Sequence, residues 1–296
     1  MSQLESLRAI ANAVLYEGYM LYPYRPSALK NQRPGWSFGS LLPPAYAAVN
    51  PGESALMSGQ VLASADGKAS LEIEARFLQL QDNTAEGTTE RSVEVHTPIG
   101  EILHQSRTTP FMFESHFPIE GLLEIRAELI AEKLVRISLS LRNTSQTPQN
   151  FSKRDEALQQ ALIAAHAVMI VSNGEFVSLL NPPDSFRSAA AGCRHTGVFP
   201  VLAGDPAERT AMLLSPIILY DYPQIAPESR GDFFDSAEID EILTLRVLTL
   251  SEAEKQEIQR TSSRAREVLQ RTESATPEEV LKMHGVFRDL HRAKGE

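Results

Sequence analysis

The sequence predicts an α+β fold: an antiparallel β-sandwich-like core with an N-terminal helix and C-terminal helices. Three observations support this prediction. Apolar and polar residues alternate in several stretches between residues 55 and 145, as in strands with one face in water. Apolar residues recur at helical spacing in residues 4–20. Two capping-box patterns, each of which marks a helix start, occur after residue 250.

Residues 1–50 combine the N-terminal helix with an aromatic, basic segment. Prolines at positions 23, 26, 34, 43 and 44 predict that the segment after the helix is extended. Its rings and cations could stack a planar ligand, bind an anion, cover a core, or meet the acidic side chains of the same chain. The binding candidates in it are Tyr19, Tyr22, Tyr24, Arg25, Lys30 and Trp36.

Residues 51–150 are the predicted antiparallel β region. The alternation in residues 71–77 predicts one strand, preceded by a turn at Asp66-Gly67, and Val93 and Val95 begin another. Alternating runs at 122–129 and 135–141 predict a hairpin with its turn at residues 131–133.

Residues 151–250 read as a mixed α/β region that packs on this sheet. Residues 157–165 fit a helix, and residues 168–177 fit a hairpin that turns at Asn173-Gly174. Residues 251–296 contain the two C-terminal helices. We expect the four regions to form one compact domain.

An acidic stretch follows the apolar run Met212–Tyr220, which reads as a buried strand. Polar groups at the end of a core strand are where sites are commonly built, so these acids could hold a cation or ligand. Asp235 and Glu238 also suit the start of a helix, which is a purely structural role. The binding candidates here are Asp221, Tyr222, Glu228, Asp232 and Asp235.

Cys193 and His195 are a second candidate site. In an extended segment their spacing would place both side chains on one face, where they could ligate a soft metal or supply a nucleophile. The alternative is that the cysteine only fills space in the core. The candidate metal ligands are therefore Cys193, His195, Asp221 and Glu228, and a divalent metal is the one cofactor that the sequence suggests.

Composition narrows the function classes. The net charge of −10 argues against a nucleic-acid partner, because a phosphate backbone repels an acidic surface. No apolar run is long enough to span a bilayer and no leader-like segment is present, which predicts a cytoplasmic protein. The sequence contains no phosphate loop, nucleophile elbow, paired-histidine zinc helix or kinase motif, and this favours a binding protein over an enzyme.

Three stretches carry a family resemblance: VLYEGYMLYPYRPSALKNQ (14–32), AAGCRHTGVFPVLAGD (190–205) and SPIILYDYPQIAPESRGDFFDSAEIDEILTLRVLTLSEAEKQ (215–256). They resemble a family of uncharacterised bacterial proteins encoded beside [NiFe]-hydrogenases of the actinobacterial, oxygen-tolerant type. The resemblance covers most of the chain but little of residues 50–149. It implies association with hydrogenase assembly or operation, and it supplies no catalytic or metal-ligand residues.

The leading hypothesis is an accessory protein that acts by binding in [NiFe]-hydrogenase maturation or assembly, with a hydrogenase subunit or a maturation protein as its partner. The first alternative is a metal-dependent enzyme that uses the acidic loop 221–241 to hold a divalent cation. The second is a β-sandwich module that binds a sugar or another small molecule.

Overall fold

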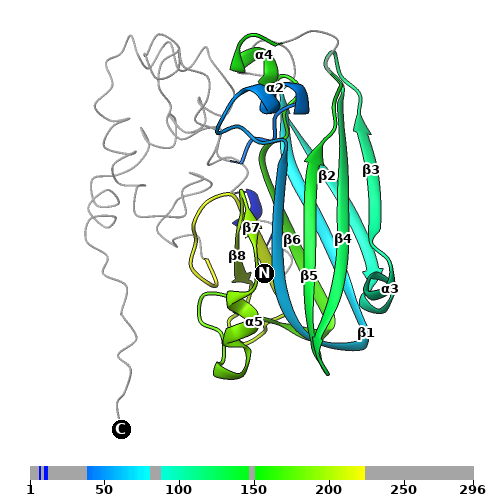
Figure 1. Ribbon diagram of the computed structural model, residues 1–296, viewed down its shortest axis with the longest axis vertical. Helices are drawn as coiled ribbons and strands as arrows, with labels where there is room; N and C mark the ends of the chain where they lie inside the picture. The colour runs from blue at the N-terminus through cyan, green and yellow to red at the C-terminus, as the bar shows by residue number, and fades with distance from the viewer. Residues whose placement is uncertain (1–6, 8–9, 13–38, 81–87, 147–150, 224–296) are drawn as a thin grey trace, which may run out of the picture.

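The described part of the chain forms one curled antiparallel sheet with short helices at its ends (Figure 1). The structure is a computed structural model, and it describes residues 7, 10–12, 39–80, 88–146 and 151–223. Seven strands follow one another in the order β3-β4-β5-β1-β6-β9-β8, while β2 and β7 both pair with β1.

The elements have the following bounds. The strands are β1 (Leu56–Leu80), β2 (Thr88–Pro98), β3 (Arg107–Phe113), β4 (Ile119–Ala131), β5 (Leu134–Asn143), β6 (Ile163–Val177), β7 (His195–Thr196), β8 (Phe199–Ala203) and β9 (Ala211–Ser215). The helices are α2 (Pro44–Val49), α3 (Ile99–His104), α4 (Arg154–Leu158), α5 (Arg187–Ala191) and the 3-10 turn η1 (Asp184–Phe186).

Strand β1 organises the sheet because its two halves have different neighbours. Residues 56–64 pair with β5, whereas residues 70–80 pair with β2. On its other side β1 pairs with β6, and the register shifts between Ala65 and Ser70. A shift of this kind bends a strand and increases its twist. The bent strand therefore crosses from one layer to the other and curls the sheet into a nearly closed, barrel-like shape.

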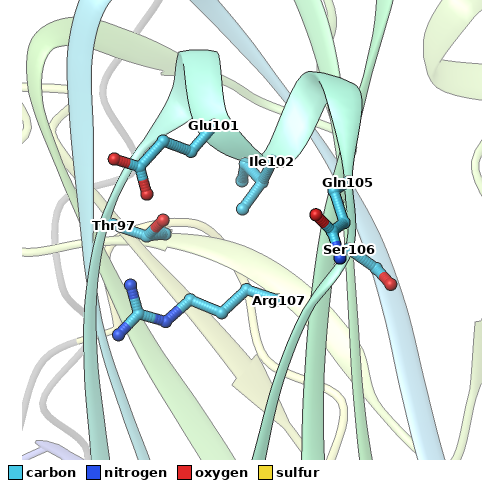
Figure 2. A pocket seen from close by; sticks show the side chains of 6 residues that line it. All are labelled: Thr97, Glu101, Ile102, Gln105, Ser106 and Arg107. Carbon is cyan, nitrogen blue, oxygen red and sulfur yellow. The ribbon is translucent and has the colours of Figure 1, made fainter.

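Helix α3 joins β2 to β3 across the opening of this barrel. Figure 2 shows the helix arching between the two strands, which do not pair with each other. Ile99 and Ile102 of α3 are buried in the main core. The helix therefore closes one end of the barrel, while α2 and α4 lie at the other end (Figure 1).

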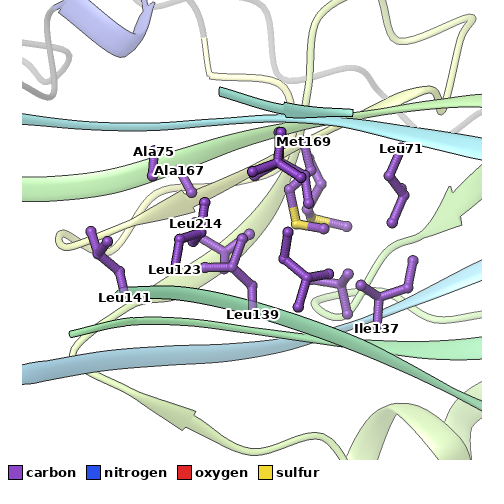
Figure 3. Close-up of a cluster of buried hydrophobic side chains, with 14 of the residues drawn as sticks. Leu71, Ala75, Leu123, Ile137, Leu139, Leu141, Ala167, Met169 and Leu214 are labelled. Carbon is purple, nitrogen blue, oxygen red and sulfur yellow. The ribbon is translucent and has the colours of Figure 1, made fainter. Parts of the chain in front are cut away.

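The core lies between the two layers (Figure 3). Leu71, Ala167 and Met169 come from one layer, and they face Ile137 and Leu139 from the other. All five are almost fully buried, as expected for the inward-facing half of strands that alternate along one face. The hydrophobic effect of this burial is the main force that holds the curled sheet closed.

An aromatic cluster packs inside the barrel near β3. The ring of Phe111 lies 5.8 Å from that of Phe77 and 5.8 Å from that of Phe113, measured between centroids. Phe111 faces Gly121 on β4, and a Cβ atom at Gly121 would lie 2.0 Å from Cζ of the Phe111 ring. Position 121 must therefore be glycine for the ring to cover the strand. Arg91 of β2 stacks on Phe113, 5.0 Å from its centroid.

The N-terminal helix is described only at Leu7 and residues 10–12, which are helical. Leu7, Ile10 and Ala11 pack on the outer side of the sheet, in a second core cluster with residues of β6, β8 and β9. Asn12 anchors the helix to β1, because its Oδ1 accepts a hydrogen bond of 2.7 Å from Nη2 of Arg76.

The predicted α+β sandwich is wrong. The described residues are mostly antiparallel β-structure, and both layers belong to one sheet because β1 continues from one into the other. A sandwich requires two separate sheets. The predicted C-terminal helices lie outside the described residues.

Several predicted elements are confirmed. The strand at residues 71–77 is part of β1, Val93 and Val95 lie in β2, and the hairpin is β4 with β5. The expected helix at 157–165 is wrong in extent, since α4 ends at Leu158 and the chain then enters β6.

Two predicted turns are wrong, because the residues concerned lie inside long strands. Asp66-Gly67 lies within β1, and Asn173-Gly174 lies within β6, where Asn173 has a φ of 58°. The predicted strand through Tyr220 also ends early, because β9 stops at Ser215. Ile218 and Tyr220 are 79% and 88% exposed, which a buried strand does not allow. Among the described residues, no helix has the length and apolar character needed to cross a membrane.

Candidate binding surface

Most of the predicted site residues lie outside the described part of the chain. They are Tyr19, Tyr22, Tyr24, Arg25, Lys30, Trp36, Glu228, Asp232 and Asp235. Asp221, Tyr222, Cys193 and His195 are described, and their surroundings indicate what each side chain does.

Asp221 joins the segment after β9 to two other parts of the fold. Its Oδ2 accepts a hydrogen bond of 2.5 Å from Oγ of Ser178, and its Oδ1 accepts one of 2.8 Å from the backbone N–H of Leu202. Both carboxylate oxygens are therefore engaged within the protein. In the described chain this residue has the geometry of a structural clamp.

Tyr222 extends the same clamp. Its backbone N–H donates to the carbonyl of Leu202 at 2.7 Å, and its φ of 57° turns the chain there. The ring packs against the main core. Burial raises the pKa of the phenol, and the charge of Arg209 opposes that rise. We call residues 221–222 the strap, because they fix the chain along β8.

We expect Asp221→Asn to lower the free energy of unfolding by about 1–2 kcal/mol, because the amide nitrogen of Asn cannot accept one of the two hydrogen bonds. Urea denaturation of the full chain measures this loss. Asp205→Asn is the matched control, since its Oδ1 accepts a single bond, from Ala207 N–H in an exposed turn. Equal losses in the two variants would argue against a clamp at Asp221.

Cys193 is buried, whereas His195 is exposed. Cys193 follows α5 in a helical turn, with its N–H donating to the carbonyl of Ala190 at 3.0 Å, so the segment is not extended as predicted. The thiol is buried with Leu62 and Val177. This burial raises the pKa of the Cys193 thiol, although nearby Arg136 opposes the rise. A protonated, enclosed thiol is a poor nucleophile and a poor metal ligand.

His195 lies at the surface on β7. Its Nδ1 accepts a hydrogen bond of 3.4 Å from the backbone N–H of Gln60 on β1. Partial burial lowers the pKa of the imidazole, and the charge of Arg194 adds to this effect. Among the described residues, no group of three or more His, Cys, Asp or Glu side chains is arranged to hold a metal ion.

A polar hollow of about 300 Å³ lies next to His195 on the outer side of β1, β4 and β5. The strand register explains it. Ser140 of β5 pairs with Ser58 of β1 and with Glu124 of β4, and Ser138 pairs with Gln60 and Arg126. In each of these two cross-strand rows, the middle residue, on β5, is therefore a serine with a small side chain. The hollow is lined by Ser58, Gly59, Gln60, Glu124, Arg126, Ser138, Leu139, Ser140 and Arg194.

Hydrogen bonds hold one wall of the polar hollow in place. Gln60 donates from Nε2 to Oγ of Ser138 at 3.2 Å, and its Oε1 accepts from the backbone N–H of Arg194 at 2.9 Å. The guanidinium of Arg194 also donates to the carbonyls of Ala191 and Cys193. Arg126 has no ion pair within the described residues. The polar hollow thus presents two guanidinium groups and serine hydroxyls to a polar ligand.

A smaller hollow, of about 240 Å³, lies under α3 (Figure 2). Figure 2 shows Arg107 of β3 extending across the opening toward β2, with the carboxylate of Glu101 on the other side of Thr97. Thr97 is fully buried, and its Oγ1 donates to the carbonyl of Pro98. This hollow has one carboxylate, Glu101, and one guanidinium, Arg107, whereas the polar hollow has one carboxylate and two guanidinium groups.

The sequence did not reveal the polar hollow, although it carries a signal for it. Serines at positions 138 and 140 stand on the outer side of β5, where long polar side chains are more usual. Comparison with known proteins does not add to this picture, because no family model and no curated protein matches the chain.

Proposed function

We propose that the protein is a cytoplasmic accessory protein that acts by binding in [NiFe]-hydrogenase maturation or assembly. The family resemblance of residues 14–32, 190–205 and 215–256 supports the partner in this proposal. The polar hollow supports the mode of action, because it is open, polar and built on the rigid centre of a sheet.

The polar hollow would receive an acidic group of the partner. Arg126 and Arg194 border it, and guanidinium groups bind carboxylates through paired hydrogen bonds. Glu124 lies in the same wall and could orient the partner by meeting a cation next to that acidic group. The stretch 190–205 of the resemblance includes Arg194, so one family segment reaches the polar hollow.

Deletion of the gene in a host that depends on the hydrogenase tests the proposal. We expect hydrogenase activity and nickel content of the enzyme to fall by about tenfold, and the wild-type gene to restore both. Normal activity and normal nickel loading in the deletion strain would contradict the role.

Complementation with variants then tests the polar hollow. We expect Arg126→Glu to restore little activity and to weaken capture of the hydrogenase subunits by about tenfold, because it reverses a charge at the contact. Arg142→Glu is the control, since Arg142 is also an exposed arginine on this face of the sheet but does not line the polar hollow. Full complementation by both variants would retain the hydrogenase role but remove the polar hollow from it.

A further inference from the structure

Among the longer described strands, β8, β3 and β2 each have an outer edge that another chain could approach, and two of these edges are blocked. The edge strand β8 contains Pro200, and the strap occupies both the N–H and the carbonyl of Leu202. The edge strand β3 contains Pro110 at its centre. Proline removes a donor, and natural proteins use it to protect edges from further pairing.

The third edge is the outer side of β2. It has neither a proline inside the strand nor hydrogen bonds to the strap. Strand β2 pairs with β1 without interruption from Thr88–Leu80 to Pro98–Ser70, and no described strand pairs with its other side. Its single proline, Pro98, is its last residue. Alternate residues of such a strand direct their N–H and carbonyl groups away from the sheet. The edge is therefore long and regular, and a strand added to it would lie in the barrel opening between β2 and β3, where Arg91 already stacks on Phe113.

Carboxylates dominate the outer face beside this edge. Glu74 of β1 lies directly opposite Glu94 of β2, and Glu72 lies two residues before Glu74 on the same face. Arg76 forms ion pairs with Glu74 (3.6 Å) and Glu90 (3.3 Å), whereas Glu72 and Glu94 have no ion pair within the described residues. Like charges in directly opposed positions destabilise a sheet. A cation placed next to Glu94 would offset this repulsion.

We propose that the outer edge of β2 is a docking site for an extended segment of a partner protein that carries Lys or Arg at alternate positions. The segment adds a further antiparallel strand to the sheet. Its backbone hydrogen bonds to β2 provide affinity, and its cations next to Glu94 provide selectivity. The inference is independent of the proposed role in hydrogenase maturation and of the polar hollow, which lies on β1, β4 and β5.

The probe is a fluorescein-labelled peptide about as long as β2, with lysine alternating with valine and threonine. We expect it to bind the full chain in a fluorescence anisotropy titration. A version with Glu in place of Lys tests the charge, and a version N-methylated at alternate residues tests the backbone hydrogen bonds. We expect both to bind at least about tenfold more weakly. Equal binding of the N-methylated peptide would overturn the proposal, because charge alone would then explain the binding.

Charge reversal on the protein provides the second test. We expect Glu94→Lys to weaken binding of the lysine peptide by at least about tenfold while the circular dichroism spectrum is unchanged. Glu175→Lys is the matched control, since Glu175 is an exposed glutamate on β6, with no ion pair among the described residues. Equal effects of the two variants, or no binding of the lysine peptide to the unaltered chain, would overturn the proposal.

Discussion

Asn143→Asp should lower the free energy of unfolding by about 3–5 kcal/mol, a large share of the stability of a typical domain. Asn143 is fully buried, and its Nδ2 donates to the carbonyls of Leu41 (2.9 Å) and Gln160 (2.7 Å). Its Oδ1 accepts from the N–H of Ser145 at 2.9 Å. The substitution keeps the shape of the side chain but points a second oxygen at two carbonyl oxygens, so two hydrogen bonds become repulsive contacts.

Two of the three bonds of Asn143 reach other segments of the chain, and the third is local, to Ser145. Leu41 precedes α2 and Gln160 follows α4, so the side chain fixes both approaches to one end of the barrel. Urea denaturation measures the loss, and Asn50→Asp is the matched control. Asn50 donates one bond, to the carbonyl of Tyr46 at the end of α2, and we expect a loss of about 1 kcal/mol. Comparable losses in the two variants would contradict the importance of the buried bonds.

Local pattern predicted the strands whose partners are close in the sequence. The hairpin of β4 and β5 is visible because each strand alternates cleanly and a short turn separates them. The same reasoning failed at Asp66-Gly67, where Asp66 does accept a local hydrogen bond from the N–H of Lys68, because β1 pairs with distant strands both before and after this point. Strand β1 is held on both sides of the bend, by β5 and β6 before it and by β2 and β6 after it, and this pairing fixes the direction of the chain where local pattern predicted a turn.

The polar hollow was harder to predict because it depends on the register between neighbouring strands. The polar hollow exists because Ser58, Ser138 and Ser140 face the same side in neighbouring strands, and Ser58 is about eighty positions away from the other two along the chain. The sequence pattern identified Asp221 as a notable residue but not its hydrogen bonds to Ser178 and Leu202, which also depend on tertiary pairing.

Among the described residues, the largest pH effect on stability should come from His166. This residue is fully buried, and desolvation lowers the pKa of its imidazole to about 4, from 6.5 in an unfolded chain. The charge of Arg76 on the adjacent strand lowers the pKa further, while the hydrogen bond of Nδ1 with the carbonyl of Ala164, at 2.8 Å, opposes the shift. The folded state therefore holds His166 neutral where the unfolded state would protonate it.

This difference between the folded and unfolded pKa of His166 determines whether acid stabilises or destabilises the folded chain. Below pH 6.5 the unfolded chain takes up a proton that the folded chain takes up only near pH 4, so acid favours unfolding. Relative to a side chain that does not titrate, His166 should cost about 2 kcal/mol of stability at pH 5 and about 3 kcal/mol at pH 4. Well above pH 6.5, where the unfolded chain also leaves His166 neutral, its contribution should not change with pH.

Replacement of His166 by glutamine tests the effect, because glutamine can still donate to the carbonyl of Ala164 but takes up no proton in this range. Urea denaturation at a series of pH values should show that His166→Gln flattens the decline in stability from pH 6.5 to pH 4. His96→Gln, on the exposed face of strand β2, should leave the decline unchanged. Parallel curves for the unaltered chain and His166→Gln would contradict the assignment. The acid response would then have to arise from the carboxylates of the sheet.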